Sequence, residues 1–528
     1  MNQSFVPSLT ADHVLSRLSS GTIPMRVALP VSAVSGLILV LSYPPFALWP
    51  LMFVSVACAL WTLIGRTVLG ALAVGLAFGG TFYAALLSWV SSFLGPMPWV
   101  ALTSLEAGLF GLGAIPIALG FRWGSRRSQF DRLQLIGVPL VVAGLWVTRE
   151  IVMGAWPYSG LPWARLGVAL APSRLADAAS WVGTNGLSFL VVAALTGLIQ
   201  WIRNSGPRSA RGVAVTFITA SVLVATPQFP TTDVGTLRIA WVQGNGPAGY
   251  FDDRSPGDVL RAQTAATTPL RSRKVDLVVW PEGGVDSDPL ADRATALALD
   301  RIVDDAAAPV LINAAVTRNG RVFNTSLLWT SGPGTPDGYD KVNLVPFGEY
   351  IPNRSFFEWL APDTVGLLKR DYTAGNRPPV VTLEGVPIGL AICFDAIYDA
   401  VIWDGVRSGA QVFVFQTNNA DFRGTSENSQ QLALARMRAI ETGRSVVSVS
   451  TIGASQVVAP DGSIISTSAP NKAVAGVDTV PLRAGRTPAS IVSPLLGIAT
   501  PLLSATALLV LGLRWRRMTH HKAQRFEE

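Results

Sequence analysis

Cysteine and histidine are the scarcest reactive residues in this chain of 528 residues. The two cysteines are Cys58 and Cys393, and the three histidines are His13, His520 and His521. Cys58 lies in an apolar stretch and Cys393 in a distant polar region, so we expect no intramolecular disulfide. All three histidines lie in the terminal tails. The long segment between them therefore has no Ser-His-Asp triad, no Cys-His dyad and no histidine-ligated zinc, and we expect neither a metal nor a cofactor.

Charged residues are also few, at 14% of the chain, against 49% hydrophobic residues and a mean hydropathy of +0.40. This composition exceeds what a soluble globular protein normally carries and predicts a membrane protein. The net charge is +7, but the arginines lie mainly in short gaps between apolar runs. That distribution is typical of a topology signal, whereas a nucleic-acid-binding protein carries a basic face, so we expect no nucleic-acid partner.

Eight apolar runs are candidate transmembrane helices, each with a length near the ~20 residues that a span needs. They lie at roughly 27–43, 45–65, 68–91, 98–121, 133–154, 186–202, 212–229 and 488–513. A long stretch of mixed polar and apolar character separates the seventh run from the eighth. We therefore predict a bundle of seven transmembrane helices over residues 27–230, a soluble domain over 236–484 and an eighth helix over 488–513.

Arginine placement predicts the topology, because positive charge accumulates on the cytoplasmic side of a membrane. Arginines cluster in alternate gaps and in the tail RWRRMTHHKAQR, whereas the remaining gaps hold only Arg165 and Arg174. We predict cytoplasmic tails at 1–26 and 514–528, with the soluble domain on the outer face. The polar start has no cleavage signal, so the first run is expected to be a retained helix.

Strand-like and helix-like segments alternate in the soluble domain. The strand-like segments, rich in β-branched and aromatic residues, are 236–243, 275–282, 308–316, 322–330, 386–394, 410–417 and 445–453. Helical patterns lie at 291–306 and 425–443, the second with Thr425 or Ser426 as N-cap and Gly443 just past its end. The alternation predicts an α/β domain with helices packed over sheet.

Three acids and one lysine are candidate partners for the cysteine of the soluble domain. Glu282 ends a predicted strand, Lys341 is one of only five lysines, and Asp395 follows Cys393 by two positions. Without a histidine, a carboxylate is the available base. We therefore assign Glu282 as general base, Cys393 as nucleophile and Lys341 as oxyanion stabiliser, with a thioester as the product. Glu349 and Asp395 are either supporting acids or partners in structural hydrogen bonds.

Six short segments of the chain form a set. They are WPEGG (280–284), YDKVNLVPFGEYIP (339–352), AICFD (391–395), QGN (243–245), SGLPW (159–163) and ARMRAIETGR (435–444). The set resembles the apolipoprotein N-acyltransferases, membrane members of the nitrilase superfamily, and the resemblance covers nearly the whole chain. It implies an α/β fold beside an all-α membrane bundle, with a nitrilase-like αββα sandwich inserted between the seventh and eighth of eight transmembrane helices.

The resemblance also implies a ping-pong acyltransferase with Glu282, Lys341 and Cys393 as its triad. A phospholipid, typically phosphatidylethanolamine, would donate its sn-1 acyl chain to the cysteine. The acyl group would then pass to the α-amine of the diacylglyceryl-cysteine that begins an apolipoprotein. The expected partners are these two substrates and the lipid bilayer, and the expected oligomeric state is a monomer. The implied location is the inner membrane, with the catalytic domain on the periplasmic face.

The chain departs from the family pattern beside the cysteine and in one aromatic position. Phe394 and Asp395 stand where the family commonly has Tyr-Glu, and Phe251 stands near a position often held by tryptophan. Phe251 and Trp163, the latter from SGLPW, are candidate substrate-binding residues.

The segment 353–370 is unusually apolar for a loop. We predict that it dips into the outer leaflet as a lid, with Phe356 and Trp359 as further substrate-binding candidates. Core packing is the alternative.

Glu106 lies in an uncharged apolar run, where an ionisable side chain costs on the order of 3 kcal/mol and is usually functional. Arg149 lies at comparable depth in the next run. We predict an ion pair between them, and a helix-packing role is the alternative.

Two other classes of protein would also account for these sequence features. A membrane-anchored nitrilase-type amidase would use the same Glu-Lys-Cys chemistry but pass the acyl group to water. A transporter with an outer ligand-binding domain would account for Glu106 and the helices, and would not need Cys393.

Overall fold

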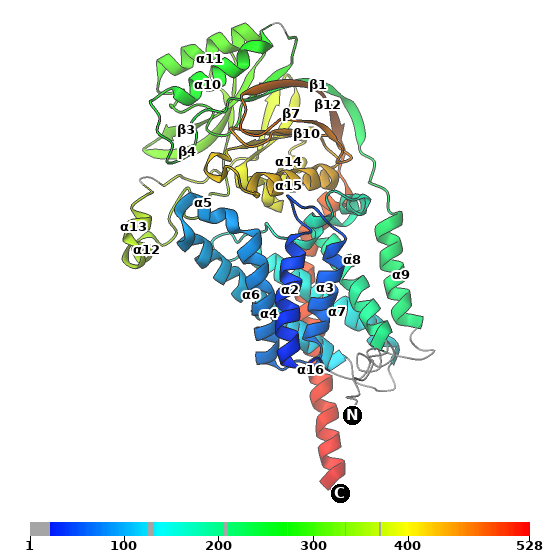
Figure 1. Ribbon diagram of the computed structural model, residues 1–528. Coiled ribbons are helices and arrows are strands. Elements are labelled where there is room, and N and C mark those ends of the chain that lie inside the picture. Colours follow the sequence, from blue (N-terminus) through cyan, green and yellow to red (C-terminus); the bar gives the residue numbers. More distant parts are fainter. Residues whose placement is uncertain are drawn as a thin grey trace, which may run out of the picture.

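The computed structural model describes residues 22–124, 131–203, 210–271, 273–332, 334–368 and 371–527. The predicted N-terminal tail lies almost entirely outside this range, as does His13. Figure 1 shows two regions: an elongated bundle of helices, and an α/β region at one end of it. The final helix runs from the α/β region along the bundle and beyond it.

Each predicted apolar run lies on a helix. These helices are α2 (Met25–Val40), α3 (Leu51–Leu63), α4 (Val68–Leu86), α6 (Pro96–Gly124), α7 (Asp131–Met153), α8 (Ala179–Arg203), α9 (Ala210–Ala225) and α16 (Pro488–Glu527). Among the described residues, α4, α6, α7, α8 and α16 are long and apolar enough to cross a membrane, and α2, α3 and α9 are shorter. The predicted membrane protein with several apolar helices is confirmed. Eight complete spans stay a prediction.

The predicted boundary between the first two runs is wrong. The run expected to begin at 45 becomes helical only at Leu51, because Pro44, Pro45 and Pro50 interrupt the backbone hydrogen bonds that a helix needs. The residues 41–50 form turns instead.

Small residues let α4 and α6 approach closely. A Cβ atom added at Gly75 would lie 2.8 Å from the Cα of Gly111, and one added at Gly79 would lie 3.1 Å from the Cα of Ala107. Close approach of helix backbones at small residues holds helices together where lipid removes the hydrophobic driving force.

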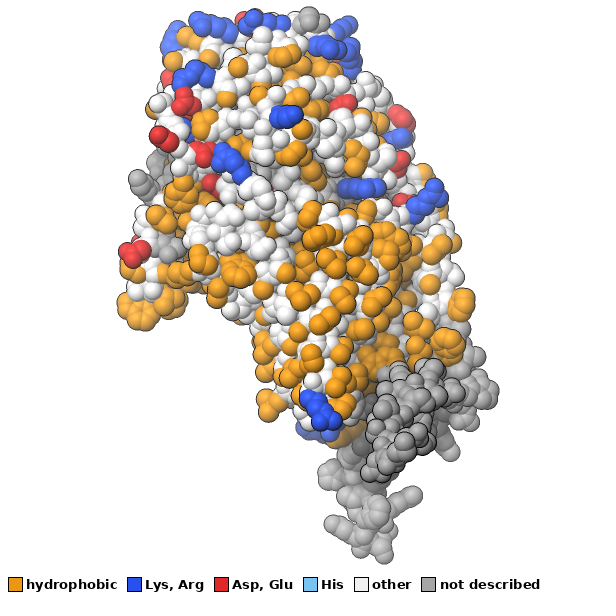
Figure 2. Space-filling view, in the orientation of Figure 1, with side chains coloured by type: hydrophobic (Ala, Val, Ile, Leu, Met, Phe, Trp, Pro, Cys, Tyr) orange, Lys and Arg blue, Asp and Glu red, His pale blue; other side chains and the backbone are white. Residues whose placement is uncertain are grey.

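The surface of the helical bundle is apolar. Figure 2 shows hydrophobic side chains over the bundle, whereas most lysine, arginine and acidic side chains lie over the α/β region. The last helix, α16, has large exposed apolar side chains: Leu495, Ile498, Leu502, Leu503 and Leu509. Such a surface is suited to lipid.

Arg149 is buried in the bundle, and its ion pair differs from the predicted one. Its Nη2 lies 3.7 Å from Glu150 Oε1, and its guanidinium lies over the rings of Phe110 and Trp146. Among the described residues there is no ion pair between Arg149 and Glu106. Glu150, the residue after Arg149 on α7, is therefore the ion-pair partner of Arg149 in place of the predicted Glu106.

The α/β region contains two six-stranded sheets. The first has the order β12-β1-β2-β3-β4-β5, and the second has the order β11-β10-β9-β8-β7-β6. The strands of the first sheet are β1 (Thr232–Gln243), β2 (Leu277–Val279), β3 (Val310–Arg318), β4 (Arg321–Trp329), β5 (Asp337–Asp340) and β12 (Val474–Ala484). Those of the second are β6 (Val380–Leu383), β7 (Val386–Ile392), β8 (Val412–Thr417), β9 (Val446–Ser450), β10 (Gln456–Val458) and β11 (Ile464–Thr467).

Helices cover the outer face of each sheet, which gives four layers in the order αββα. Helices α10 (Asp258–Thr267) and α11 (Arg293–Ala306) cover the first sheet, and α14 (Asp399–Arg407) and α15 (Glu427–Thr442) cover the second. The α14–α15 layer faces the helical bundle (Figure 1). Because both faces of the central strands are covered, these strands are mostly apolar, and every residue of β8 is buried.

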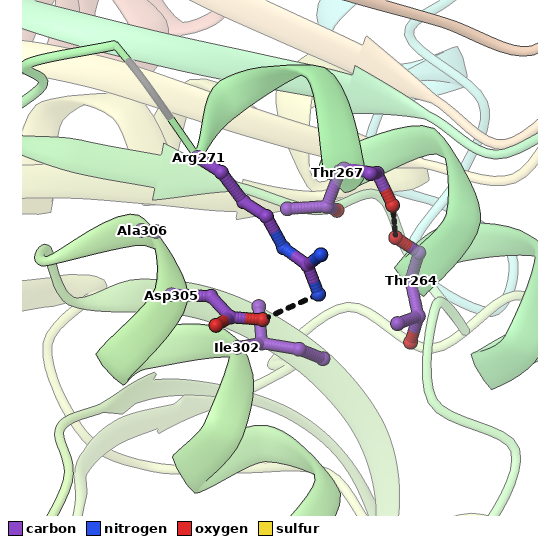
Figure 3. A pocket seen from close by; sticks show the side chains of 7 residues that line it. Thr264, Thr267, Arg271, Ile302, Asp305 and Ala306 are labelled. Atoms are coloured by element: carbon purple, nitrogen blue, oxygen red, sulfur yellow. Dashed lines mark hydrogen bonds and ion pairs between the residues drawn. The ribbon is translucent and has the colours of Figure 1, made fainter.

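A small pocket in the outer helical layer lies between α10 and α11 (Figure 3). It is lined by Thr264, Thr267, Thr268, Arg271, Ile302, Asp305 and Ala306. Arg271 Nη2 donates to Asp305 Oδ2 at 2.7 Å, so the pocket is bordered by a surface ion pair. It contains none of the candidate site residues.

Candidate active site

Glu282, Lys341 and Cys393 follow the ends of three strands, one each from β2, β5 and β7. Cys393 begins the short 3-10 helix η6 (Cys393–Ile397) and has φ 51°, a left-handed conformation that is rare for residues other than glycine. The change of direction after β7 places η6 against α15. The side chain is nearly buried, at 7% exposure.

Lys341 lies between two carboxylates. Its Nζ is 3.0 Å from Glu349 Oε2 and 3.6 Å from Glu282 Oε1, and the residue is 1% exposed. Burial acts to lower the pKa of Lys341, but Glu349 and Glu282 together raise it well above the ordinary value. The lysine is therefore a fixed positive charge at neutral pH, as an oxyanion stabiliser must be.

Glu282 has the environment of a general base. Burial raises its pKa above the ordinary value, and Glu349 acts in the same direction, while Lys341 opposes them. Asn324 and Cys393 also act to lower this pKa, and Glu282 Oε2 accepts the backbone N–H of Asn418 at 3.1 Å. A carboxylate with a raised pKa takes a proton more readily.

The thiol of Cys393 needs such a base. Burial raises its pKa well above the ordinary value, with a further contribution from Glu282, and Lys341 acts in the opposite direction. The thiol is therefore neutral at rest, and attack on a carbonyl requires transfer of its proton to a neighbouring group.

Two asparagines that we did not predict hold the acids. Asn324 Nδ2 donates to Glu282 Oε1 at 2.8 Å and to Glu349 Oε1 at 2.9 Å. Asn313 Nδ2 donates to Asn324 Oδ1 at 2.9 Å, and the backbone N–H of Gly283 donates to Asn313 Oδ1 at 2.8 Å. Asn313 could have been found from the sequence, because it is a polar residue inside the apolar strand VLINAAV.

Asp395 connects the cysteine turn to the lysine segment. It is fully buried and accepts Tyr339 Oη at 2.9 Å and the backbone N–H of Asn343 at 3.0 Å. Burial raises its pKa to about 6. Of the two interpretations that the sequence left open, its contacts favour the structural one, because Lys341 pairs with Glu282 and Glu349 instead.

Phe394 and Trp163 lie against each other, with ring centroids 5.2 Å apart, and Trp89 lies 5.1 Å from Trp163. The residue beside the cysteine therefore packs on a loop of the helical region. Trp163 Nε1 also donates to Gln430 Oε1 on α15 at 2.6 Å. Trp163 is buried, and it contacts the cysteine turn through Phe394.

Phe251 lies farther out. It is exposed and packs on Phe93 and Tyr250, with ring centroids 6.1 and 5.0 Å away. Phe93 in turn lies 6.4 Å from Phe422, whose ring is 5.2 Å from that of Trp89. Phe251 is thus connected to Phe394, beside the cysteine, through one aromatic row that includes Trp163.

The apolar segment forms α12 (Arg354–Leu360) and α13 (Pro362–Val365), which project beside the helical bundle (Figures 1 and 2). Phe356 is 52% exposed and Trp359 is 78% exposed, so core packing does not explain these two rings. The segment is attached at its base, where Phe357 packs on Phe347 and Asn353 Nδ2 donates to Tyr158 Oη at 3.1 Å.

Two family models match this chain. The model of the apolipoprotein N-acyltransferase N-terminal domain matches residues 35–197, and the carbon-nitrogen hydrolase model matches 238–484. Together with the two covered sheets, these matches define a carbon-nitrogen hydrolase domain attached to a membrane bundle. Among the solved structures that this chain matches is XC1258 of Xanthomonas campestris, a CN-hydrolase superfamily protein. It has a TM-score of 0.35 and 22% identity, and the match covers 47% of this chain and 91% of that chain.

Relatives in other bacteria identify the family. The apolipoprotein N-acyltransferase of Mycolicibacterium smegmatis is 31% identical over 493 residues, which cover 85% of this chain and 79% of the relative. That of Photobacterium profundum is 27% identical, with 89% and 90% covered. The chain belongs to the apolipoprotein N-acyltransferase family, and the predicted resemblance is confirmed.

Proposed function

We propose that this chain transfers an acyl group from a phospholipid, through a thioester on Cys393, to the N-terminal amine of a diacylglyceryl-modified apolipoprotein. The main supporting observation is that Lys341 Nζ lies 3.6 Å from Glu282 Oε1, and that both groups act on the pKa of the buried Cys393 thiol. The packing of Phe394 on Trp163 supports access from the membrane, because it joins the cysteine turn to the helical region.

In the first half-reaction Glu282 takes the proton of Cys393, and the sulfur attacks the sn-1 ester carbonyl. Lys341 stabilises the oxyanion of the tetrahedral intermediate. The C–O bond breaks, and the proton on Glu282 passes to the departing lysophospholipid oxygen. A thioester remains on the enzyme.

In the second half-reaction the neutral α-amine of the acceptor attacks the thioester. A C–N bond forms, the C–S bond breaks, and the sulfur leaves with the electron pair. Glu282 takes a proton from the attacking nitrogen and returns it to the sulfur, which restores the starting state. Glu282 therefore serves as base and then as acid in both halves.

The proposal includes a location. Eight spans would place both termini in the cytoplasm and the α/β region at the periplasmic face of the inner membrane. Phosphatidylethanolamine is the proposed donor, and the chain is proposed to act as a monomer. The exposed rings of α12 would then lie at the level of the outer leaflet, where donor and acceptor lipids are found.

The experiment that tests this function is intact-mass analysis of the purified chain mixed with phosphatidylethanolamine. We expect one acyl adduct that hydroxylamine removes, absent in Cys393→Ala and present in Cys58→Ser, the matched change at the other cysteine. Adding a diacylglyceryl peptide should consume the adduct and yield an N-acylated peptide. Release of free fatty acid without peptide acylation would instead identify the amidase-like alternative, and an adduct that persists in Cys393→Ala would contradict the proposal.

A further inference from the structure

Gln431 contacts the sulfur from α15, a helix that the proposed reaction does not otherwise use. Its Nε2 donates to Cys393 Sγ at 3.8 Å, and the residue is 2% exposed. A neutral N–H donor is therefore held, away from water, on the atom that carries the nucleophilic charge.

The orientation of this amide follows from hydrogen bonds that begin at the backbone. The N–H of Ala454 donates to Asn428 Oδ1 at 2.9 Å, so Asn428 presents its Nδ2 to Asn419 Oδ1 at 3.1 Å. Asn419 then presents its own Nδ2 to Gln431 Oε1, also at 3.1 Å. Because its oxygen is bound in this way, Gln431 can direct only its N–H group to the sulfur.

A buried acid supports the same amide. Asn419 Nδ2 also donates to Glu427 Oε2 at 2.6 Å. Glu427 is fully buried, its Oε1 has no hydrogen-bond partner among the described residues, and burial raises its pKa to about 8. A buried carboxyl with an unsatisfied oxygen destabilises the fold, so its presence here calls for a role at the site.

We propose that Gln431 is a further catalytic residue, whose N–H hydrogen-bonds the sulfur of Cys393 in its thiolate form. We further propose that Glu427 is a positioning residue, which acts on Gln431 through Asn419.

The charges around the sulfur explain why a neutral donor is useful there. Glu282, Glu427 and Glu349 all disfavour the thiolate, as burial does, and Lys341 favours it. A second cation would bind the acids instead, whereas an amide N–H stabilises negative charge on sulfur without changing the net charge of the site.

The N–H group of Gln431 acts in both half-reactions, and this part of the inference rests on the proposed function. In the first, the thiol proton goes to Glu282 and the sulfur uses its electron pair to form the C–S bond. In the second, that bond breaks and the pair returns to sulfur. Gln431 keeps its own protons throughout and stabilises the sulfur charge each time.

The test is the pH dependence of alkylation of Cys393 by iodoacetamide, followed by intact mass on the full chain with Cys58→Ser as background. Replacement of Gln431 by Met keeps the length of the side chain and removes the donor. We expect the apparent pKa of the thiol to rise by about one unit, so that alkylation below that pKa slows about tenfold. Gln456→Met, the matched change on β10, should leave the profile unchanged.

A second variant keeps the test decisive if Gln431→Met does not fold. Gln431→Asn is polar but withdraws the N–H by about one C–C bond, so it should also raise the thiol pKa. A profile equal to that of Gln456→Met in the folded Gln431 variant would overturn the assignment.

The role of Glu427 has its own readout. Glu427→Leu and Glu427→Gln both remove the carboxylate that disfavours the thiolate, but only Gln keeps an acceptor for Asn419. The thiol pKa should therefore be higher in Glu427→Leu than in Glu427→Gln, but only while Gln431 is present. An equal effect of Glu427→Leu in the Gln431→Met background would overturn the positioning role.

Alkylation needs no acyl donor, so the two proposals fail separately. Acyl transfer with an unshifted alkylation profile would overturn the role of Gln431 alone. A shifted profile in a chain that acylates no peptide would overturn the proposed function alone.

Discussion

The second acid beside the lysine, Glu349, is expected to set the base strength of Glu282. Both Oε1 atoms accept from Asn324 Nδ2, at 2.8 and 2.9 Å, so they lie no more than about 5.7 Å apart. Two like charges at that separation repel by about 3 kcal/mol at an effective dielectric constant of about 20, which corresponds to about two pKa units. Glu349→Gln removes this repulsion while keeping the size of the side chain.

We therefore expect Glu349→Gln to lower the pKa of Glu282 by about one to two units. The acid limb of thioester formation should move to lower pH by the same amount, because Glu282 must be ionised to take the thiol proton. The rate on the plateau should fall, because a weaker base removes that proton less effectively. The assay is single-turnover acylation of the purified chain by a fluorescent phospholipid at pH values from about 5 to 9, with the acyl-enzyme measured after acid quench.

Glu358→Gln is the matched control, because Glu358 is an exposed acid on α12 that pairs with Arg354. Its pH profile should equal that of the wild type, and thermal melting of both variants verifies that they are folded. An acid limb of Glu349→Gln that stays in place or moves to higher pH would refute the reasoning, since it would mean that Glu349 does not repel charge on Glu282.

Two further predictions concern the lid segment and Asp395. Replacing Phe356 and Trp359 by Ser should slow turnover with phospholipid vesicles and leave thermal melting unchanged; an unfolded variant or an unaffected rate would count against a lid. The pKa of Asp395 rises on folding from 3.8 to about 6, so the folded state holds the proton more tightly between those values. Stability should therefore fall by about 3 kcal/mol as pH rises through this window, and Asp395→Asn should remove that dependence; a denaturant titration at pH 4 and pH 7 measures both.

Much of the fold was predictable because its signals are local. All seven predicted strands are present, and the predicted helix at 425–443 is α15, which begins after Ser426 and ends at Gly443 in a left-handed conformation. Buried parallel strands need long apolar runs, and an overlying helix needs a cap and a glycine end, so these elements can be recognised one at a time.

The strands that we missed depend on contacts with distant parts of the chain. β12 pairs with β1 over its whole length, from Thr232 opposite Ala484 to Gln243 opposite Val474, yet its sequence VAGVDTVPLRA contains glycine, aspartate and proline. Strand propensity does not favour that composition, and the partner lies more than 200 positions earlier. β5, β6, β10 and β11 have only three or four residues, which is too short for a periodic pattern.

The site residues also divide into those that the local sequence predicts and those that depend on contacts with distant parts of the chain. Glu282, Lys341 and Cys393 were predicted by residue type, because a chain without a central histidine offers few groups for thiol chemistry, and the structure places Lys341 beside Glu282. Asn324 was not, because its function depends on the antiparallel pairing of β3 with β4, which brings it beside Asn313. Asparagine carries no charge, so the residue type of Asn324 does not mark it as a partner of the two acids, whereas Asn313 stands out as a polar residue inside the apolar strand VLINAAV.

The position of the cysteine turn depends on the junction between the α/β region and the helical bundle. Arg438 on α15 donates from Nε to Ala396 O and from Nη2 to Ile397 O, at 2.9 and 2.7 Å, so it holds the turn that begins at Cys393. Its Nη1 pairs with Asp399 at 2.8 Å and with Glu441 at 2.7 Å. The turn is thus fixed by charge as well as by the backbone of β7.

Asp399 and Glu441 also contact residues of the helical region. Arg165 Nη1 lies 2.7 Å from Asp399 Oδ1, and Glu441 Oε1 accepts the backbone N–H and the hydroxyl of Thr184. Burial opposes ionisation of Asp399, but its two arginines lower its pKa to about 2, so the network stays charged at every physiological pH. Buried ion pairs contribute little net stability, because desolvation offsets their attraction, but they tolerate few alternative arrangements. The network therefore fixes the register between the bundle and the cysteine turn, which the proposed approach of a lipid substrate from the bilayer to the sulfur requires.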